Sequence, residues 1–171
     1  MLFQFKDTEI SVNMPDYTAL QDGVAAKLRD GQGFALATIN LDHVVKLNSS
    51  APFRKAYAAQ DFVVADGNPI VWLGRLAGHK LDLLPGSDLA VPLAKLAADM
   101  GIPVALCGST PEALAAAADG LVERIPSLQI AARIAPPFGF DPQGSDADAC
   151  LDEIAASGAG LCFLALGAPK Q

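Results

Sequence analysis

The sequence is poor in charged, aromatic and cysteine residues, and each shortage excludes a class of protein. Only 18% of the 171 residues are charged and the formal net charge is −7, which argues against wrapping a phosphate backbone. The same charge argues against adhesion of this chain by itself to an anionic membrane. Aromatic residues make up 6%, too few for a platform on which single-stranded bases stack. No apolar run is long enough to cross a bilayer, and the first residues lack the pattern of a signal peptide.

The residue clusters of several catalytic classes are missing as well. The three cysteines, Cys107, Cys150 and Cys162, show no metal-ligand spacing, and Cys107 and Cys162 lie in apolar runs that predict buried, inert thiols. A reducing cytoplasm is compatible with this cysteine content. The chain has no nucleophile elbow, and no second carboxylate stands close to Asp66 for glycosidase chemistry. We therefore predict neither a metal ion nor a cofactor.

What the sequence does contain is an apolar pattern typical of α/β proteins. Half of the residues (51%) are apolar, and a chain of 171 residues is long enough for one domain with a substantial core. Short apolar runs that predict strands alternate with amphipathic stretches that predict helices, which favours a parallel sheet. The predicted strands cover residues 34–37, 62–65, 103–107, 127–134 and 161–166, after a hairpin of residues 2–5 and 9–12.

We predict an α/β, Rossmann-like, doubly wound and mainly parallel sheet with helices on both faces and a small N-terminal hairpin. Residues 1–171 would form a single domain. The last predicted strand is followed by only a short loop and no covering helix, which is an unusual end for such a domain. We therefore expect the chain to be truncated at its C-terminus.

Polar residues follow the first two core strands at the point where each strand ends. Thr38 and Asn40 follow residues 34–37, and Asp66 and Gly67 follow residues 62–65. Ligands of open parallel sheets bind beyond the carboxyl ends of the strands, so we expect these groups to converge on one cleft for a hydroxyl-rich substrate. Asp66 could then be a general base, an acceptor for sugar hydroxyls or a metal ligand, and its alternative role is that of a turn former. We expect His43 to be a packing or capping residue.

A second candidate feature is the turn Gly108-Ser109-Thr110-Pro111, where a predicted strand leads into a helix. Backbone N–H groups at such a helix start can hold a diphosphate, and small residues permit close approach. The turn matches neither a Walker loop nor a full dinucleotide fingerprint, and an ordinary helix start is the alternative.

The sequence also predicts two local features elsewhere in the chain. Ser87 or Asp88 would cap the helix that carries Leu89, and residues 136–140 would form a stiff loop with exposed aromatic rings.

Several short motifs in a shared order resemble the WecG/TagA/CpsF glycosyltransferase family over nearly the whole chain. Each motif alone is weak, and their order and spacing make the resemblance specific. The motifs are Thr38-Ile39-Asn40, Asp42-His43-Val44, Ala65-Asp66-Gly67, Gly86-Ser87-Asp88-Leu89, Leu106-Cys107-Gly108-Ser109 and Gly167-Ala168-Pro169-Lys170-Gln171.

The resemblance implies an inverting, metal-independent enzyme that moves a sugar from a UDP donor to a polyprenyl-diphosphate-linked acceptor. N-acetylmannosamine, its uronic acid or glucose would be the sugar, and teichoic acid, enterobacterial common antigen, capsule or exopolysaccharide the product. It also implies a cytoplasmic enzyme, peripheral to the inner face of the plasma membrane through a C-terminal segment that this chain lacks. Nucleic acid is not an expected partner, and a homo-oligomer is possible.

Carried over by position, the resemblance implies a role for each motif residue. Asp66 would take the proton of the acceptor hydroxyl, Thr38 and Asn40 would orient the acceptor or donor sugar, and Gly108 and Ser109 would lie against the nucleotide. Gln171 would reach the cleft from the last strand. The remaining motif residues predicted to bind substrate are Gly67, Gly86 and Asp88.

One departure from the family pattern affects the diphosphate. Relatives often carry an arginine in the loop before Gly-Ser-Asp, where this chain has Leu83, so Arg75 or Lys80 would have to take its place. With this loss and the missing segment, we expect this chain by itself to bind UDP-sugar weakly and to turn over poorly. Two other functions stay open at this point, namely a non-catalytic nucleotide-binding α/β module and a hydrolase of sugar nucleotides.

Overall fold

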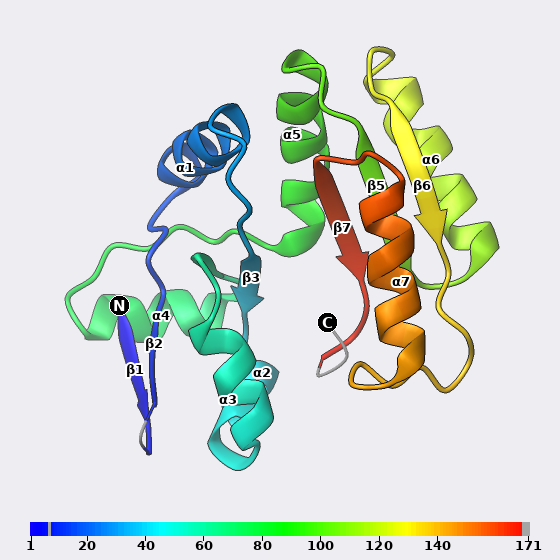
Figure 1. Cartoon of the computed structure of the whole chain (residues 1–171). Helices are drawn as coiled ribbons and strands as arrows, with labels where there is room; N and C mark the ends of the chain where they lie inside the picture. Colours follow the sequence, from blue (N-terminus) through cyan, green and yellow to red (C-terminus); the bar gives the residue numbers. More distant parts are fainter. Residues whose placement is uncertain (7, 169–171) are drawn as a thin grey trace. The chain divides into compact units, whose positions relative to one another are not determined.

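The structure is a computed structural model that describes residues 1–6 and 8–168. The chain divides into two compact units, Met1–Leu89 and Ala90–Gln171. The expectation of a single domain stays a prediction. The strands are β1 (Leu2–Phe5), β2 (Thr8–Ser11), β3 (Leu36–Ile39), β4 (Phe62–Ala65), β5 (Val104–Gly108), β6 (Ile130–Ile134) and β7 (Leu161–Ala165), and the helices are α1 (Tyr17–Arg29), α2 (Leu41–Ser49), α3 (Ala51–Ala58), α4 (Asn68–Leu76), α5 (Gly86–Asp99), α6 (Pro111–Arg124) and α7 (Ser145–Ala156) (Figure 1).

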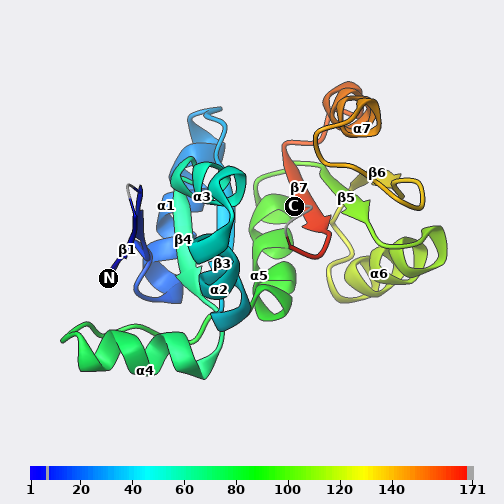
Figure 2. The ribbon, with the colours of Figure 1, turned by 90° about the horizontal axis from the view of Figure 1, so that it is seen from below.

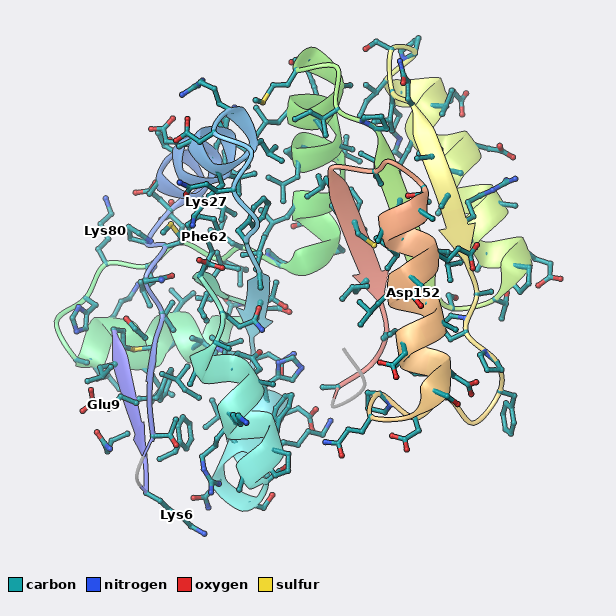
Figure 3. The ribbon with its side chains drawn as sticks, viewed as in Figure 1. Lys6, Glu9, Lys27, Phe62, Lys80 and Asp152 are labelled. Atoms are coloured by element: carbon teal, nitrogen blue, oxygen red, sulfur yellow. The ribbon has the colours of Figure 1, made fainter. Side chains whose placement is uncertain are left out.

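The first unit contains the predicted hairpin and the first pair of core strands. β1 and β2 pair antiparallel, and β3 and β4 pair parallel. Helix α1 packs on this pair, because a Cβ built on Gly23 would lie 3.1 Å from the ring of Phe62. Figure 3 shows Phe62 close to Lys27 of the same helix, and the Lys27 ammonium lies 3.4 Å from the Asp61 carboxylate. The buried β4 strand and the amphipathic α1 therefore both contribute to the core of this unit.

The first core strand begins two residues later than the sequence pattern predicts. β3 covers Leu36–Ile39, so Thr38 lies inside the strand, opposite Val64, and only Asn40 follows it. The reason lies in the hydrogen bonds before the strand. The carbonyl of Ala35 accepts from the amides of Asp61 and Phe62, which sets the register of the pair. Beyond it the ladder continues through Ile39, whose carbonyl accepts from the Asp66 amide.

Side-chain caps define the starts of several helices. Asp16 accepts a hydrogen bond from the Ala19 amide at the start of α1, and Thr110 does the same for Ala113 at the start of α6. The prediction of a Ser87 or Asp88 cap for α5 is wrong, because that helix already begins at Gly86. Ser87 instead donates to the Asp88 carboxylate, which lies in the first turn of the helix and faces its positive end.

The second unit is a three-stranded parallel sheet in the order β6-β5-β7. Helices α6 and α7 lie on opposite faces of this sheet, as both views show (Figures 1 and 2). All five residues of β5 are buried, which is expected of a central strand covered on both sides.

The prediction that the loop of residues 136–140, after β6, exposes its aromatic rings is correct for only one of its two phenylalanines. Phe138 is fully exposed, whereas Phe140 is buried.

Both units have parallel strands joined through helices, so the predicted α/β, Rossmann-like class is confirmed, together with the N-terminal hairpin. The core of each unit consists mainly of aliphatic side chains from these strands and the inner faces of the helices, together with buried aromatic residues such as Phe53 and Phe140. Trp72 and Leu76 of α4 are an exception, since they are 58% and 86% exposed. In the part of the chain that the structure describes, no helix has the length and apolar character needed to cross a membrane.

Candidate active site

The centre of the candidate site lies at the carboxyl ends of β3 and β4. The Thr38 hydroxyl donates a hydrogen bond to the Asp66 carboxylate over 3.2 Å (Oγ1 to Oδ2). The register explains this contact. Thr38 lies opposite Val64, and side chains two residues apart on a strand share a face, so Asp66 emerges on the face of Thr38. Both side chains are half-buried. The sequence prediction that these two residues lie close together therefore holds.

Two glycines lie beside this pair, one adjacent in the sequence and one from another element. Gly67, directly after Asp66, has a φ of 102° and precedes α4, a conformation that residues with a side chain rarely adopt. Gly86 approaches from the start of α5, and a Cβ there would lie 3.3 Å from the Thr38 methyl group. The loop before it is held by the amide of Leu84, which donates to the carbonyl of Ala65. Thr38, Asp66 and Gly86 thus form one cluster.

Asn40, directly after β3, and Asp88, in the first turn of α5, each have local partners. The side-chain oxygen of Asn40 accepts from the His43 amide and caps α2. Its NH₂ group is therefore the part of the side chain suited to a ligand. Asp88 is exposed in the first turn of α5 and accepts from Ser87. The predicted substrate roles of Asn40 and Asp88 stay predictions.

Two aromatic residues behind Thr38 were not part of the predicted site. The Tyr57 hydroxyl donates to the Thr38 carbonyl over 2.7 Å, and Nδ1 of His43 lies 2.6 Å from the same hydroxyl. His43 and Tyr57 are 6% and 5% exposed, and their rings pack edge-on against Phe53. The sequence places His43 and Tyr57 as polar aromatic residues on the buried faces of helices, and such a pattern does not reveal which group each side chain contacts. His43 is a packing residue, as predicted, with the polar contact in addition.

Burial and nearby charge act on both of these groups. Burial lowers the pKa of His43, against smaller opposing effects of the Thr38 carbonyl and the Asp42 and Asp66 charges, so the imidazole is neutral near pH 7. Burial and the negative charge of Asp66 raise the pKa of Tyr57. The tyrosine therefore keeps its proton as a hydrogen-bond donor at every physiological pH.

The turn at Gly108 and Ser109 belongs to the second unit. Gly108 has a φ of 118°, and a Cβ there would lie 2.4 Å from the backbone oxygen of Ala165 in β7. Ser109 has a φ of 56°, which is strained for a residue with a side chain. At the helix start, Thr110 caps the Ala113 amide, and the Glu112 carboxylate, whose pKa is lowered by its own amide, adds a negative charge. A phosphate at the first amides of α6 would meet that charge, so the turn itself is the better candidate contact.

A comparison with protein families decides the class to which these features belong. The model of the family described as "Glycosyl transferase WecG/TagA/CpsF family" matches residues 5–171. The chain belongs to this glycosyltransferase family. The match begins at Phe5, the last residue of β1, and extends through both units, and membership implies a transferase that uses a nucleotide-sugar donor and a lipid-linked acceptor in general.

Residues predicted to replace the missing loop arginine of this glycosyltransferase point to solvent. Leu83 is 41% exposed, and Arg75 is exposed on α4. Lys80 extends outward from the loop after α4 (Figure 3). Gln171, the last predicted site residue, lies outside the described residues.

Two cysteines and an Asp-x-Asp sequence of the glycosyltransferase lie where they serve the fold. Burial raises the pKa of Cys107 and of Cys162 to about 11, so both are protonated, poorly nucleophilic thiols near pH 7. An Asp-x-Asp sequence, Asp146-Ala147-Asp148, lies in the first turn of α7, where its carboxylates stabilise the positive end of the helix. Over residues 1–6 and 8–168, no group of three His, Cys, Asp or Glu side chains is arranged to hold a metal ion.

Proposed function

We propose that the chain carries out an inverting transfer of a sugar from a UDP donor to a polyprenyl-diphosphate-linked acceptor, with Asp66 as the general base. The observation that carries the proposal is the Thr38–Asp66 hydrogen bond at the carboxyl end of two neighbouring parallel strands. Ligands of open α/β sheets bind at this position, and the carboxylate there is only half-buried. Membership of a glycosyltransferase family supports the reaction class.

The chemistry follows from the two oxygens of one carboxylate. Thr38 donates to Oδ2 of Asp66, which orients the carboxylate and leaves Oδ1 for the hydroxyl of the acceptor. As the acceptor oxygen attacks the anomeric carbon, its proton moves to Asp66, and the bond from that carbon to the diphosphate oxygen of UDP breaks. Attack from the side opposite UDP inverts the anomeric centre. General base catalysis of this kind contributes about 10²–10⁴-fold in rate.

The departing UDP needs donors that stabilise its negative charge. We assign the nucleotide to the turn of Gly108 and Ser109, whose strained backbone is typical of functional sites. Gly67 and Gly86 permit close approach of the sugar to Asp66, and Asn40, Asp88 and Gln171 are further proposed contacts with the substrates. N-acetylmannosamine, its uronic acid and glucose are the candidate sugars. The lipid-linked acceptor would bring the enzyme to the inner face of the plasma membrane.

Replacement of Asp66 by asparagine tests the proposal, because the amide keeps the shape and loses the base. With a panel of UDP-sugars and a polyprenyl-diphosphate acceptor, we expect Asp66→Asn to lower kcat by about 10²–10⁴-fold. Binding of UDP, measured by calorimetry, should remain within about twofold. Asp22→Asn, an exposed aspartate on α1, is the matched control and should retain full activity.

Three outcomes would contradict the proposal. Transfer at the wild-type rate by Asp66→Asn would exclude Asp66 as the general base. UDP binding without transfer by the wild-type chain, with every donor and acceptor of the panel, would favour a non-catalytic nucleotide-binding module. UDP release without acceptor would indicate a hydrolase of sugar nucleotides.

A further inference from the structure

The buried pair of His43 and Tyr57 is linked to the candidate catalytic carboxylate through Thr38, whose backbone carbonyl bonds Tyr57 and whose hydroxyl bonds Asp66. The linkage runs from Nδ1 of His43 to the Tyr57 hydroxyl (2.6 Å), from that hydroxyl to the Thr38 carbonyl (2.7 Å), and from the Thr38 side chain to Asp66 (3.2 Å). These four residues come from α2, α3, β3 and the end of β4. Thr38 is the point at which the buried part of the linkage meets the half-buried part.

The direction of each hydrogen bond follows from the number of protons available. The Tyr57 hydroxyl has one proton, and it donates this proton to the Thr38 carbonyl, which can only accept. The same hydroxyl must therefore accept from His43, and Nδ1 of the imidazole must carry a proton. Since burial keeps His43 neutral, Nε2 is then the deprotonated nitrogen.

We propose that Tyr57 and His43 are positioning residues for the reaction, which together hold Thr38 so that its hydroxyl orients the Asp66 carboxylate. The inference rests on the proposed role of Asp66 as the base. Tyr57 touches no substrate in this proposal; it holds the carbonyl of the residue whose side chain bonds the carboxylate. His43 in turn orients the tyrosine hydroxyl, and its backbone amide donates to the side chain of Asn40, the residue that caps α2.

Packing alone does not account for the pair. A phenylalanine at position 57 and an aliphatic residue at position 43 would fill the same space beside Phe53 without any buried polar atom. Buried polar groups are costly unless they are hydrogen-bonded, and a fully connected network favours one arrangement over others. Here the favoured arrangement concerns the last residues of β3, which carry Thr38. A merely structural pair would contribute to stability without affecting the rate of transfer.

The first test is spectroscopic and needs no substrate. The chain has two histidines and two tyrosines, so ¹⁵N-histidine labelling gives two ring systems, and His79→Gln identifies the exposed one. We expect long-range ¹H–¹⁵N correlations at pH 7.5 to show His43 as the Nδ1–H tautomer, and to show loss of that preference in Tyr57→Phe. An Nε2–H tautomer in the wild-type chain would overturn the proposal.

The second test separates positioning from stability by kinetics. In the transfer assay, Tyr57→Phe should lower kcat about five- to tenfold, the rate equivalent of one neutral hydrogen bond, with the KM for the UDP-sugar unchanged within twofold. Tyr17→Phe is the matched control, because it removes the other tyrosine hydroxyl, at the start of α1, and should leave kcat unchanged. In a Thr38→Val background, Tyr57→Phe should have no further effect, because the link to Asp66 is already broken.

Each remaining outcome overturns one specific claim. A wild-type kcat for Tyr57→Phe, a KM that rises in step with any loss of kcat, or an equal effect in the Thr38→Val background would refute the positioning role. Asp66→Asn tells this failure apart from failure of the proposed function. If Asp66→Asn loses transfer while Tyr57→Phe retains it, only the positioning role is wrong. If Asp66→Asn retains transfer, the base assignment itself is wrong.

Discussion

Replacement of Gly108 by alanine tests whether this glycine is needed for the stability of the fold, independently of any ligand. The added Cβ would lie 2.4 Å from the oxygen and 2.6 Å from the carbon of the Ala165 carbonyl, so β5 and β7 would have to separate where they pair. The contact is with backbone, which cannot rotate away as a flexible side chain can. The φ of 118° adds strain that alanine cannot relieve.

These two effects set the expected magnitude. Strain at such a backbone conformation costs of order 1–3 kcal/mol, and overpacking typically costs about as much again. We expect Gly108→Ala to lower the free energy of unfolding by about 3 kcal/mol, which for a chain of this size lowers Tm by roughly 6–12 °C. Thermal unfolding followed by circular dichroism, without any nucleotide, measures this directly.

A second glycine provides the matched control. Gly120 lies inside α6, and a Cβ there meets open space, so Gly120→Ala should raise the free energy of unfolding by about 0.5–1 kcal/mol. The same substitution would thus have opposite signs at the two positions. A Tm for Gly108→Ala within about 1 °C of wild type, with UDP binding lost, would refute the reasoning and assign this glycine to the ligand alone.

Three further predictions follow from local contacts. Because burial lowers the pKa of His43, the unfolded chain binds more protons than the folded chain as the pH falls below the ordinary value of 6.5. The free energy of unfolding, measured with urea, should therefore decrease as the pH drops below 6.5, and this decrease should be smaller in His43→Gln. Ser109→Gly should raise the unfolding free energy by about 1 kcal/mol, because glycine tolerates the φ of 56°; an unchanged Tm would contradict this. Arg54→Ala should cost about 1.5–3 kcal/mol in the same measurement, because the buried guanidinium donates to the Leu47 carbonyl at the end of α2; a loss under 0.5 kcal/mol would contradict this.

The candidate site could be predicted from the sequence as far as local patterns reach. Apolar runs that end in polar residues marked β3 and β4, and parallel strands place such ends at one edge. Thr38 and Asp66 were therefore expected to lie close together, and the structure brings them to 3.2 Å. The boundary of β3 was wrong by two residues, because the hydrogen bonds of the Ala35 carbonyl, which a local pattern does not contain, set the register.

The sequence by itself determined the α/β class, the start of α6 at Thr110, and the pairing of a hydroxyl with a carboxylate at the strand ends, because these depend on periodicity and on neighbours along the chain. Only the tertiary structure decided why Gly108 must be glycine and what lies behind Thr38. The close approach of Ala165 and the hydroxyl of Tyr57 both come from segments distant in the sequence. Contacts of that kind leave no local pattern, since they exist only once the strands and helices have packed.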